Sequence, residues 1–284
     1  MKQDINVQNM KNEDVEIKLL LEAIYLKYGY DFKGYSQAHI KRRVLRRRHL
    51  SGFESVMKMV EKVLDDKDFL YTVIADFSIN VTEMFRDPDF YKDFRAHVVP
   101  ILKTYPYLRI WHAGCSTGEE VYSMAILLEE ENLYDKSQIY ATDFNINVLK
   151  RAKEGIYSID AIKEYTYNYQ NAGGIASFAD YYIAKYDSVI IDQSLKKRII
   201  FADHNLVTDG VFGEMNVIVC RNVLIYFSRD LQSKVVRLFH SSLSNGGFLC
   251  LGTMESLKYT GYVECFDVFS EKQKIYRKMV EAKK

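Results

Sequence analysis

From about Leu108 onward, short apolar segments alternate with longer amphipathic ones, and this alternation restricts the fold more than any other feature. The apolar segments have the length and residue types of strands. They are LRIWHA, SQIYATD, RIIFAD, MNVIVC, GFLCLG and KQKIYRK. Helical spacing of apolar residues covers residues 121–130, 146–153 and 229–243. Alternating strands and helices predict a parallel, doubly wound α/β sheet, with the ligand-binding turns along one edge.

The N-terminal part of the chain has a different pattern. Apolar residues recur at helical spacing from about residue 12 to residue 75, and no strand-like pattern precedes Tyr71. The sequence therefore predicts an all-α domain over residues 1–75 and an α/β domain over residues 76–284. A tyrosine-rich segment at about 158–195 interrupts the α/β order and predicts a short helix and a small hairpin inserted there.

Composition excludes several classes of protein. Of the 284 residues 48% are hydrophobic, and 39 Lys and Arg balance 38 Asp and Glu, so there is no global polyanion-binding charge. The polar N-terminus does not resemble a signal peptide, and no apolar run approaches the ~18 residues of a membrane span. Four scattered cysteines and six histidines show no metal-ligand spacing. We expect a cytoplasmic, metal-free monomer that does not insert into membranes.

The turn AGCSTGEE follows the first predicted strand and opens a helix. Only Gly114 and Gly118 are present, so the dinucleotide fingerprint is absent. Glu119 and Glu120 at the helix start would favour the helix dipole, but they would repel a pyrophosphate. A ligand that carries an ammonium and a sulfonium fits better, and S-adenosylmethionine has both. A turn that serves packing alone is the alternative.

Polar residues also follow two other predicted strands. Asp143 ends the strand QIYATD, where a carboxylate usually holds the ribose hydroxyls of a nucleoside. Its alternative role is to cap the helix that follows. The apolar strand NVIVC opens onto Arg221, Asn222 and Tyr226. Polar side chains at three strand ends predict a ligand site on one rim of the sheet.

These residues belong to longer motifs: NVTEMFRDPDFY, CSTGEEVYSMAILLEE, YATDFNINVLKRAKEGIY and CRNVLIYFSRDLQSKVVRLFHSSLSNGGFLCLGTMES. The chain resembles the CheR-type chemotaxis receptor methyltransferases, which methylate receptor glutamate side chains with S-adenosylmethionine. The resemblance extends to about Lys278. It implies a seven-stranded methyltransferase sheet, S-adenosylhomocysteine as product, no metal, and the cytoplasmic methylation region of a chemoreceptor as partner.

The resemblance also implies which residues form the cofactor site. They are Asn80, Thr82, Arg86, Gly114, Glu120, Asp143, Asn205, Leu206, Arg221 and Asn222. By motif, Glu120 would contact the methionine end of the cofactor and Asp143 its ribose, while Asn205 and Leu206 would flank the adenine. Arg86 and Tyr226 would be catalytic: Arg86 would pair with a carboxylate, and Tyr226 would lie near the methyl group. A surface ion pair of Arg86 with Asp87 or Asp89 is the alternative.

The chain departs from the family pattern at two places. Val121 replaces a proline that commonly follows the two glutamates, a change that we expect to be harmless. The predicted hairpin is short, whereas a β-subdomain at this place in the family can grip a peptide tether at the receptor C-terminus. Whether a tether binds here is therefore left open.

The run KRRVLRRR places Arg42, Arg43, Arg46 and Arg47 on one arc of a helix. By resemblance, this arc docks on the acidic methylation region of a receptor. A solvated helix face and a nucleic-acid contact are the alternatives, although no aromatic residues interleave the arginines.

Two other functions compete with receptor methylation. One is a non-catalytic CheR-like module that binds the cofactor or a partner. The other is a nucleic-acid methyltransferase, but CRNVLIY lacks the N-P-P-Y-like element expected of a base-amine methylase.

Overall fold

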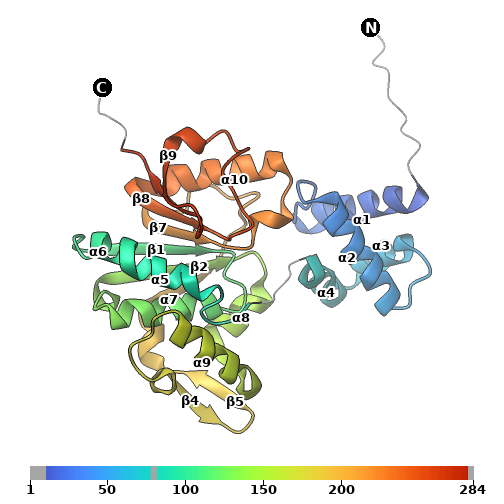
Figure 1. The fold of residues 1–284 in the computed structure, drawn as a ribbon. Helices are drawn as coiled ribbons and strands as arrows, with labels where there is room; N and C mark the ends of the chain where they lie inside the picture. The colour runs from blue at the N-terminus through green and yellow to red at the C-terminus, as the bar shows by residue number, and fades with distance from the viewer. Residues whose placement is uncertain (1–10, 78–81, 281–284) are drawn as a thin grey trace. The chain divides into compact units, whose positions relative to one another are not determined.

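The computed structural model describes residues 11–77 and 82–280. Backbone contacts divide the chain into two compact units, Met1–Ile79 and Asn80–Lys284 (Figure 1). We refer to them as the helical unit and the α/β unit. Asn80, one of the predicted cofactor residues, lies outside the described residues.

Within residues 11–77, the helical unit contains four helices. They are α1 (Asn12–Tyr28), α2 (Gln37–Leu50), α3 (Val56–Asp65) and α4 (Lys67–Phe77). Gly29 ends α1 in the left-handed region, with φ of 79°, and its N–H donates to the Tyr25 carbonyl. The Ser55 side chain accepts a hydrogen bond from the Lys58 N–H and so caps α3. The core between the helices includes Leu20, Val44 and Phe77, all fully buried. The predicted all-α N-terminal part is confirmed.

The α/β unit begins with a short helical stretch of α5 (Pro88–Asp93), η1 (Phe94–Val98) and α6 (Val99–Leu102). A sheet of seven strands follows. In chain order they are β1 (Leu108–Ala113), β2 (Ser137–Asp143), β6 (Ile199–Asp203), β7 (Met215–Cys220), β8 (Leu243–Leu251), β9 (Phe266–Ser270) and β10 (Ile275–Lys278). In space their order is β6-β2-β1-β7-β8-β10-β9.

The first five strands of that spatial order run parallel, as predicted from the alternation of strands and helices. β10 pairs antiparallel with β8, and β9 pairs antiparallel with β10, so the sheet is mixed. The apolar pattern predicts β10 but not β9, because FDVFS is short and exposes Asp267 and Val268. The seven-stranded sheet that the resemblance implies is confirmed.

Two consecutive residues of β1, whose side chains point to opposite faces, show that helices cover both faces of the sheet. Ile110 belongs to a buried cluster that includes Phe90 of α5 and Met124 of α7 (Glu119–Glu130). Trp111 points to the opposite face, where its ring centroid lies 5.6 Å from that of Phe239 on α10 (Arg229–Ser242). The remaining crossover helix is α8 (Ile146–Glu154). Helices on both faces are the doubly wound arrangement that the sequence predicts.

The insert is a three-stranded antiparallel sheet with one helix. β3 (Ile156–Ser158), β4 (Tyr182–Lys185) and β5 (Ser188–Ile191) have the spatial order β3-β5-β4, and α9 (Ile162–Asn171) lies between β3 and β4 in the chain. Figure 1 shows α9 beside β4 and β5. The predicted helix and hairpin are present, and β3, only three residues long, joins them without a sequence signal of its own.

None of the helices in residues 11–77 and 82–280 is both long enough and apolar enough to span a bilayer.

Candidate functional site

The C-terminal ends of the five parallel strands lie at one edge of the sheet. The predicted site residues of the α/β unit lie in the loops that follow these ends or in the segment before α5. The glycine turn after β1 is tied to β2, because the N–H groups of Gly114 and Cys115 both donate to the Thr142 carbonyl, at 2.8 and 2.9 Å. Gly114 has φ of 81°, and a Cβ there would lie 2.7 Å from a methyl group of Val223. Only glycine fits this turn.

Asp143 reaches back from the end of β2 to the glycine turn. Its Oδ2 accepts the Ser116 N–H at 3.0 Å, and its Oδ1 accepts the Asn145 N–H at 3.0 Å. Burial raises the pKa of Asp143 to about 6. The alternative that Asp143 caps the next helix is wrong, because the side chain of Asn145 caps α8 by accepting the Asn147 N–H. The Asp143 carboxylate has about four lone-pair sites, and backbone N–H groups of Ser116, Phe144 and Asn145 occupy only part of them.

Arg221 is the central cation of the site. Its side chain is only 1% exposed and bridges two carboxylates, Oε2 of Glu120 at 3.0 Å and Oδ2 of Asp87 at 2.7 Å. The guanidinium also donates to the Arg86 carbonyl at 3.3 Å and lies 4.2 Å from the ring centroid of Phe90. Arg221 thereby joins the loop after β7, the first turn of α7 and the segment that carries Arg86.

The pKa values of the two glutamates at the start of α7 are shifted in opposite directions. Burial alone would raise the pKa of Glu120, but the hydrogen bond with His112 and the charge of Arg221 outweigh burial and hold that pKa below its ordinary value. Nδ1 of His112 lies 3.1 Å from Oε1 of Glu120. Burial raises the pKa of Glu119 to about 7, and its carboxyl accepts a hydrogen bond from the Thr117 hydroxyl at 2.7 Å. At neutral pH Glu120 is therefore ionised, whereas Glu119 is only partly ionised.

The segment before α5 has a constrained backbone. Phe85 and Asp87 have φ of 53° and 56°, in the left-handed region that side chains rarely adopt. Phe85 is fully buried, and its N–H donates to the Ser123 hydroxyl at 2.8 Å. Thr82 and Arg86 on either side are half-buried. Strained backbone of this kind costs about 1–3 kcal/mol per residue and is concentrated at functional sites.

The remaining predicted residues lie in the loops after β6 and β7. The His204 N–H donates to the Asp143 carbonyl at 3.3 Å, which places the next two residues, Asn205 and Leu206, close to the end of β2. Both are half-buried. Asn222 has φ of 61°, and Tyr226, half-buried, ends the short helix η6 (Leu224–Tyr226).

The sequence interpretation assigned no role to His112 or Glu255, and it considered Asp87 only as a partner of Arg86. Asp87 and Arg221 are 134 positions apart and Asn222 and Glu255 are 33 apart, so no local spacing predicts these contacts. His112 lies only 8 positions before Glu120, and its place on the first predicted strand gave no reason to pair the two. The motif GTMES contains Glu255 and was the one available signal.

The predicted basic arc lies on α2 of the helical unit. Arg47 is paired with Asp76, and its Nη2 lies 2.9 Å from Oδ1 of that carboxylate. Arg42 is exposed, and Arg46 is 58% exposed with its Nη1 4.0 Å from the same carboxylate. Arg43 is half-buried. Arg42 and Arg46 are thus the most accessible charges of the arc.

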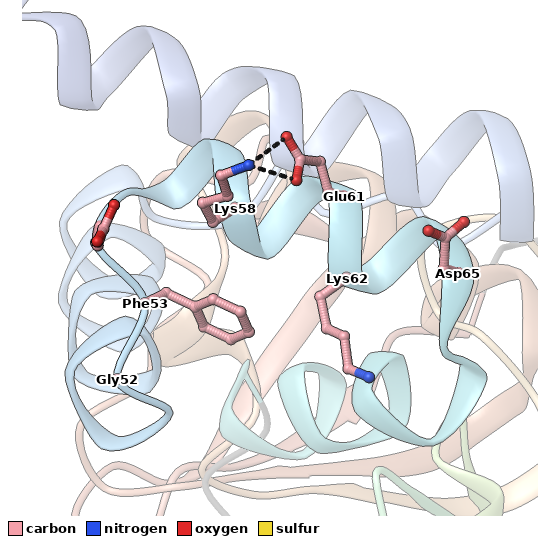
Figure 2. Close-up of a pocket in the computed structure, with 7 residues that line it drawn as sticks. Gly52, Phe53, Lys58, Glu61, Lys62 and Asp65 are labelled. Carbon is pink, nitrogen blue, oxygen red and sulfur yellow. Dashed lines mark hydrogen bonds and ion pairs between the residues drawn. The ribbon is translucent and has the colours of Figure 1, made fainter.

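The helical unit also has a shallow pocket of about 570 Å³. Figure 2 shows its lining, in which Lys58 and Glu61 form an ion pair at 2.9 Å on α3 and Phe53 lies opposite. Its lining includes none of the predicted site residues.

The donor set of the sheet edge suits a cationic nucleoside cofactor. Asp143 offers carboxylate oxygens to hydroxyl groups, and Glu120, held ionised, offers an oxygen to an ammonium. Two glutamates at the start of α7 do not suit a phosphate. Among the residues that the structure describes, no group of three or more His, Cys, Asp or Glu side chains has the arrangement of a metal site.

Comparisons with known proteins agree with this geometry. Residues 80–275 match the family described as CheR methyltransferase, SAM binding domain, and residues 15–78 match CheR methyltransferase, all-alpha domain. The chain is 50% identical over 268 residues to the Pseudomonas putida protein Cher3, whose name assigns it to the methyltransferases; the match covers 94% of this chain and 98% of Cher3. It is 32% identical to a chemotaxis protein methyltransferase of Listeria innocua, over 81% of this chain and 85% of that protein. Among solved structures, the N-methyltransferase NodS of Bradyrhizobium japonicum has 12% identity and a TM-score of 0.38, over 69% of this chain and 88% of NodS. The chain belongs to the CheR methyltransferases, enzymes with an S-adenosylmethionine-binding domain.

Proposed function

We propose that this enzyme transfers the methyl group of S-adenosylmethionine to glutamate side chains of chemotaxis receptors, giving glutamyl methyl esters and S-adenosylhomocysteine. Relatives from Listeria innocua and Pseudomonas aeruginosa are named chemotaxis protein methyltransferases. The observation that carries the proposal is the Arg221 bridge, because it holds the segment of Arg86 beside Glu120 and the loop that leads to Tyr226.

The chemistry asks little of the protein beyond orientation. S-adenosylmethionine, when bound, supplies a methyl group activated by a positively charged sulfur. A glutamate acceptor has an ordinary pKa of about 4.3, so it is ionised at neutral pH and needs no general base. Arg86 would pair with a carboxylate and so orient it, and the Tyr226 hydroxyl would donate to the incoming oxygen. Alignment and exclusion of water then account for catalysis.

Cofactor binding falls to the loops at the sheet edge. Asp143 would accept hydrogen bonds from the ribose hydroxyls, and Glu120 would accept from the ammonium of the methionine end. Asn205 and Leu206 would flank the adenine, since they follow the backbone hydrogen bond that joins the end of β6 to β2. Thr82, Gly114 and Asn222 would complete the pocket, together with Asn80.

Receptor docking falls to the predicted docking domain, residues 1–75, which lies within the helical unit. Arg42 and Arg46 are exposed on α2, and the other two arginines of the arc lie beside them. An acidic receptor helix would be attracted to this face, with roughly 0.2–1 kcal/mol from each exposed pair. The hairpin of the insert is short, with four residues in each strand and a two-residue turn at 186–187, so we propose docking without a receptor tether. We also propose that the enzyme acts as a cytoplasmic monomer.

The test is incubation of the enzyme with methyl-labelled S-adenosylmethionine and the cytoplasmic domain of a chemoreceptor from the same organism. We expect receptor label that mild base releases as methanol, because carboxyl methyl esters hydrolyse readily. Asp143→Ala, which removes the ribose contact, should transfer little label under subsaturating cofactor. Label that resists base would contradict glutamate as the acceptor.

A further inference from the structure

Glu255 lies just after β8, in the motif GTMES, and neither the site nor the mechanism above uses it. Its side chain is buried, with only 4% of the residue exposed. Both carboxylate oxygens accept backbone hydrogen bonds. Oε2 accepts from the N–H groups of Gly252 at 2.6 Å and Asn222 at 3.0 Å, and Oε1 accepts from the Ile225 N–H at 3.3 Å.

These bonds join two loops that are neighbours because their strands are neighbours. β7 and β8 pair in parallel, with Cys220 opposite Leu251 at their C-terminal ends. Asn222 and Ile225 belong to the loop after β7, whereas Gly252 and Glu255 belong to the loop after β8. One carboxylate therefore holds both ends of the segment 222–225, which leads directly into Tyr226.

The loop after β7 needs such support. Asn222 has φ of 61°, a conformation that costs a residue with a side chain about 1–2 kcal/mol relative to an ordinary helical or extended one. Asn adopts the left-handed region more readily than most residues with a side chain. The hydrogen bond that the Asn222 N–H donates to Glu255 stabilises this conformation over the alternatives. Hydrogen bonds from N–H groups to an anion are roughly twice as strong as those between neutral groups.

Gly252 shows how closely the two loops approach. A Cβ on this residue would lie 2.9 Å from the Asn222 nitrogen, 2.9 Å from Oε2 of Glu255 and 3.0 Å from the Asn222 side-chain nitrogen. Only a residue without a side chain leaves room for the carboxylate to reach the Asn222 N–H. Burial raises the pKa of Glu255, and its backbone hydrogen bonds oppose that rise, as expected for a carboxyl group placed there to accept N–H donors.

We propose that Glu255 is a positioning residue of the methyltransferase site: it sets the Asn222 side chain for the cofactor and the Tyr226 hydroxyl for the acceptor. Its carboxylate does not touch the reacting atoms in this account. The Tyr226 part rests on the proposed function, whereas the Asn222 part requires only that the enzyme binds its cofactor.

The cofactor part is tested by a double-mutant cycle in the affinity for S-adenosylhomocysteine, measured by calorimetry. Glu255→Gln keeps the size of the side chain but turns one acceptor into a donor that faces an N–H. Asn222→Gly removes the side-chain amide and keeps the backbone conformation accessible. We expect Glu255→Gln alone to weaken binding about tenfold, which corresponds to the loss of one charge-assisted hydrogen bond. In the Asn222→Gly background the same change should weaken binding less than about threefold.

Two further variants separate positioning from general stability. Glu264→Gln makes the same chemical change on an exposed carboxyl group of the same region and should leave the affinity unchanged. Gly252→Ala keeps the Glu255 carboxylate but pushes the two loops apart and disturbs the bonds that reach its Oε2. It should weaken binding in the same direction, which keeps the test valid if Glu255→Gln folds poorly. A lowered melting temperature with unchanged affinity in both Glu255→Gln and Gly252→Ala would overturn the proposal, and so would fully additive losses in the cycle.

The Tyr226 part is tested by kcat at saturating cofactor, well below the melting temperature. We expect Glu255→Gln to lower kcat severalfold when it is introduced into the wild-type enzyme. Introduced into the Tyr226→Phe variant, it should lower kcat little further. Equal factors in the two backgrounds would overturn this part. If the wild type methylates no receptor glutamate while the affinity cycle is non-additive, the proposed acceptor is wrong and the role of Glu255 toward the cofactor stands.

Discussion

Replacing Arg221 by methionine removes the cation of the site and keeps most of the side-chain volume. Two carboxylates would then face each other without it, and these differ in exposure: the Glu120 side chain is 19% exposed and that of Asp87 is 38% exposed. Removing one partner of a buried ion pair costs about 3–5 kcal/mol. Because Glu120 keeps its hydrogen bond with His112, we expect the lower end, about 3 kcal/mol.

A loss of this size is readily measured. For a domain of 150–250 residues, each kcal/mol lowers the melting temperature by about 2–4 °C, so thermal unfolding of the cofactor-free variant should begin roughly 6–12 °C below the wild type. Arg237→Met on the exposed side of α10 is the matched control, and it should shift the melting temperature by less than about 2 °C. Circular dichroism in the near ultraviolet follows the α/β unit, which contains the single tryptophan, Trp111.

The difference in stability between the wild type and Arg221→Met should depend on pH. Arg221 and His112 lower the pKa of Glu120, so the stability that this carboxylate contributes is present above its unfolded pKa and is lost as the pH falls through the folded value. The gap between wild type and Arg221→Met should therefore be widest near neutral pH and should narrow below about pH 4. A melting temperature within about 2 °C of wild type at neutral pH, or a gap that acid does not narrow, would refute the assigned role of the bridge.

Three further outcomes test the site and the docking surface. Asp143→Ala should weaken S-adenosylmethionine binding by roughly 1–3 kcal/mol. Because burial raises the pKa of Asp143 to about 6, the affinity of the wild type should also fall about tenfold between pH 7 and pH 5. If calorimetry shows neither effect, Asp143 is not part of the site. Tyr226→Phe should lower kcat more than cofactor affinity, whereas equal losses would make Tyr226 a residue of the cofactor pocket. Reversing Arg42 and Arg46 to glutamate should raise KM for the receptor, flatten its salt dependence and leave cofactor affinity intact, and a receptor without its C-terminal tail should be methylated nearly as well as the full-length form. If charge reversal has no effect and tail removal abolishes methylation, the insert is the recognition element instead.

The sequence predicts most of the sheet because β1, β2, β7 and β8 are buried over most of their length and therefore read as apolar runs. The edge strand β6 is only partly buried, but it keeps the apolar residues of RIIFAD. The antiparallel edge strand β9 and the three-residue β3 escape prediction, since an edge strand needs no continuous apolar pattern and a strand of three residues has no periodicity. Both pair with strands that were predicted, β10 and β5, so the structure adds them without changing the topology of the parallel core.

The same contrast holds for the candidate site. Gly114 and Asp143 are predictable because each follows directly from a strand end in a local motif. The bridge of Arg221 to Asp87 joins residues 134 positions apart, and the bonds of Glu255 cross between two loops, so sequence spacing contains neither. For Arg221, motif matching implied a cofactor contact, whereas its observed partners are two carboxylates and a carbonyl of the protein itself. The cofactor contact of Arg221 stays a prediction, and the protein partners are additional to it.

The most direct test of the proposed function is tandem mass spectrometry of a chemoreceptor cytoplasmic domain after incubation with the enzyme and S-adenosylmethionine, with S-adenosylhomocysteine quantified in the same reaction. The account predicts one added methyl group on specific glutamate residues, lost after mild base, with one S-adenosylhomocysteine formed for each ester. Methyl groups on lysine or another amine, or an unmodified receptor in the presence of an enzyme that binds S-adenosylmethionine, would contradict it.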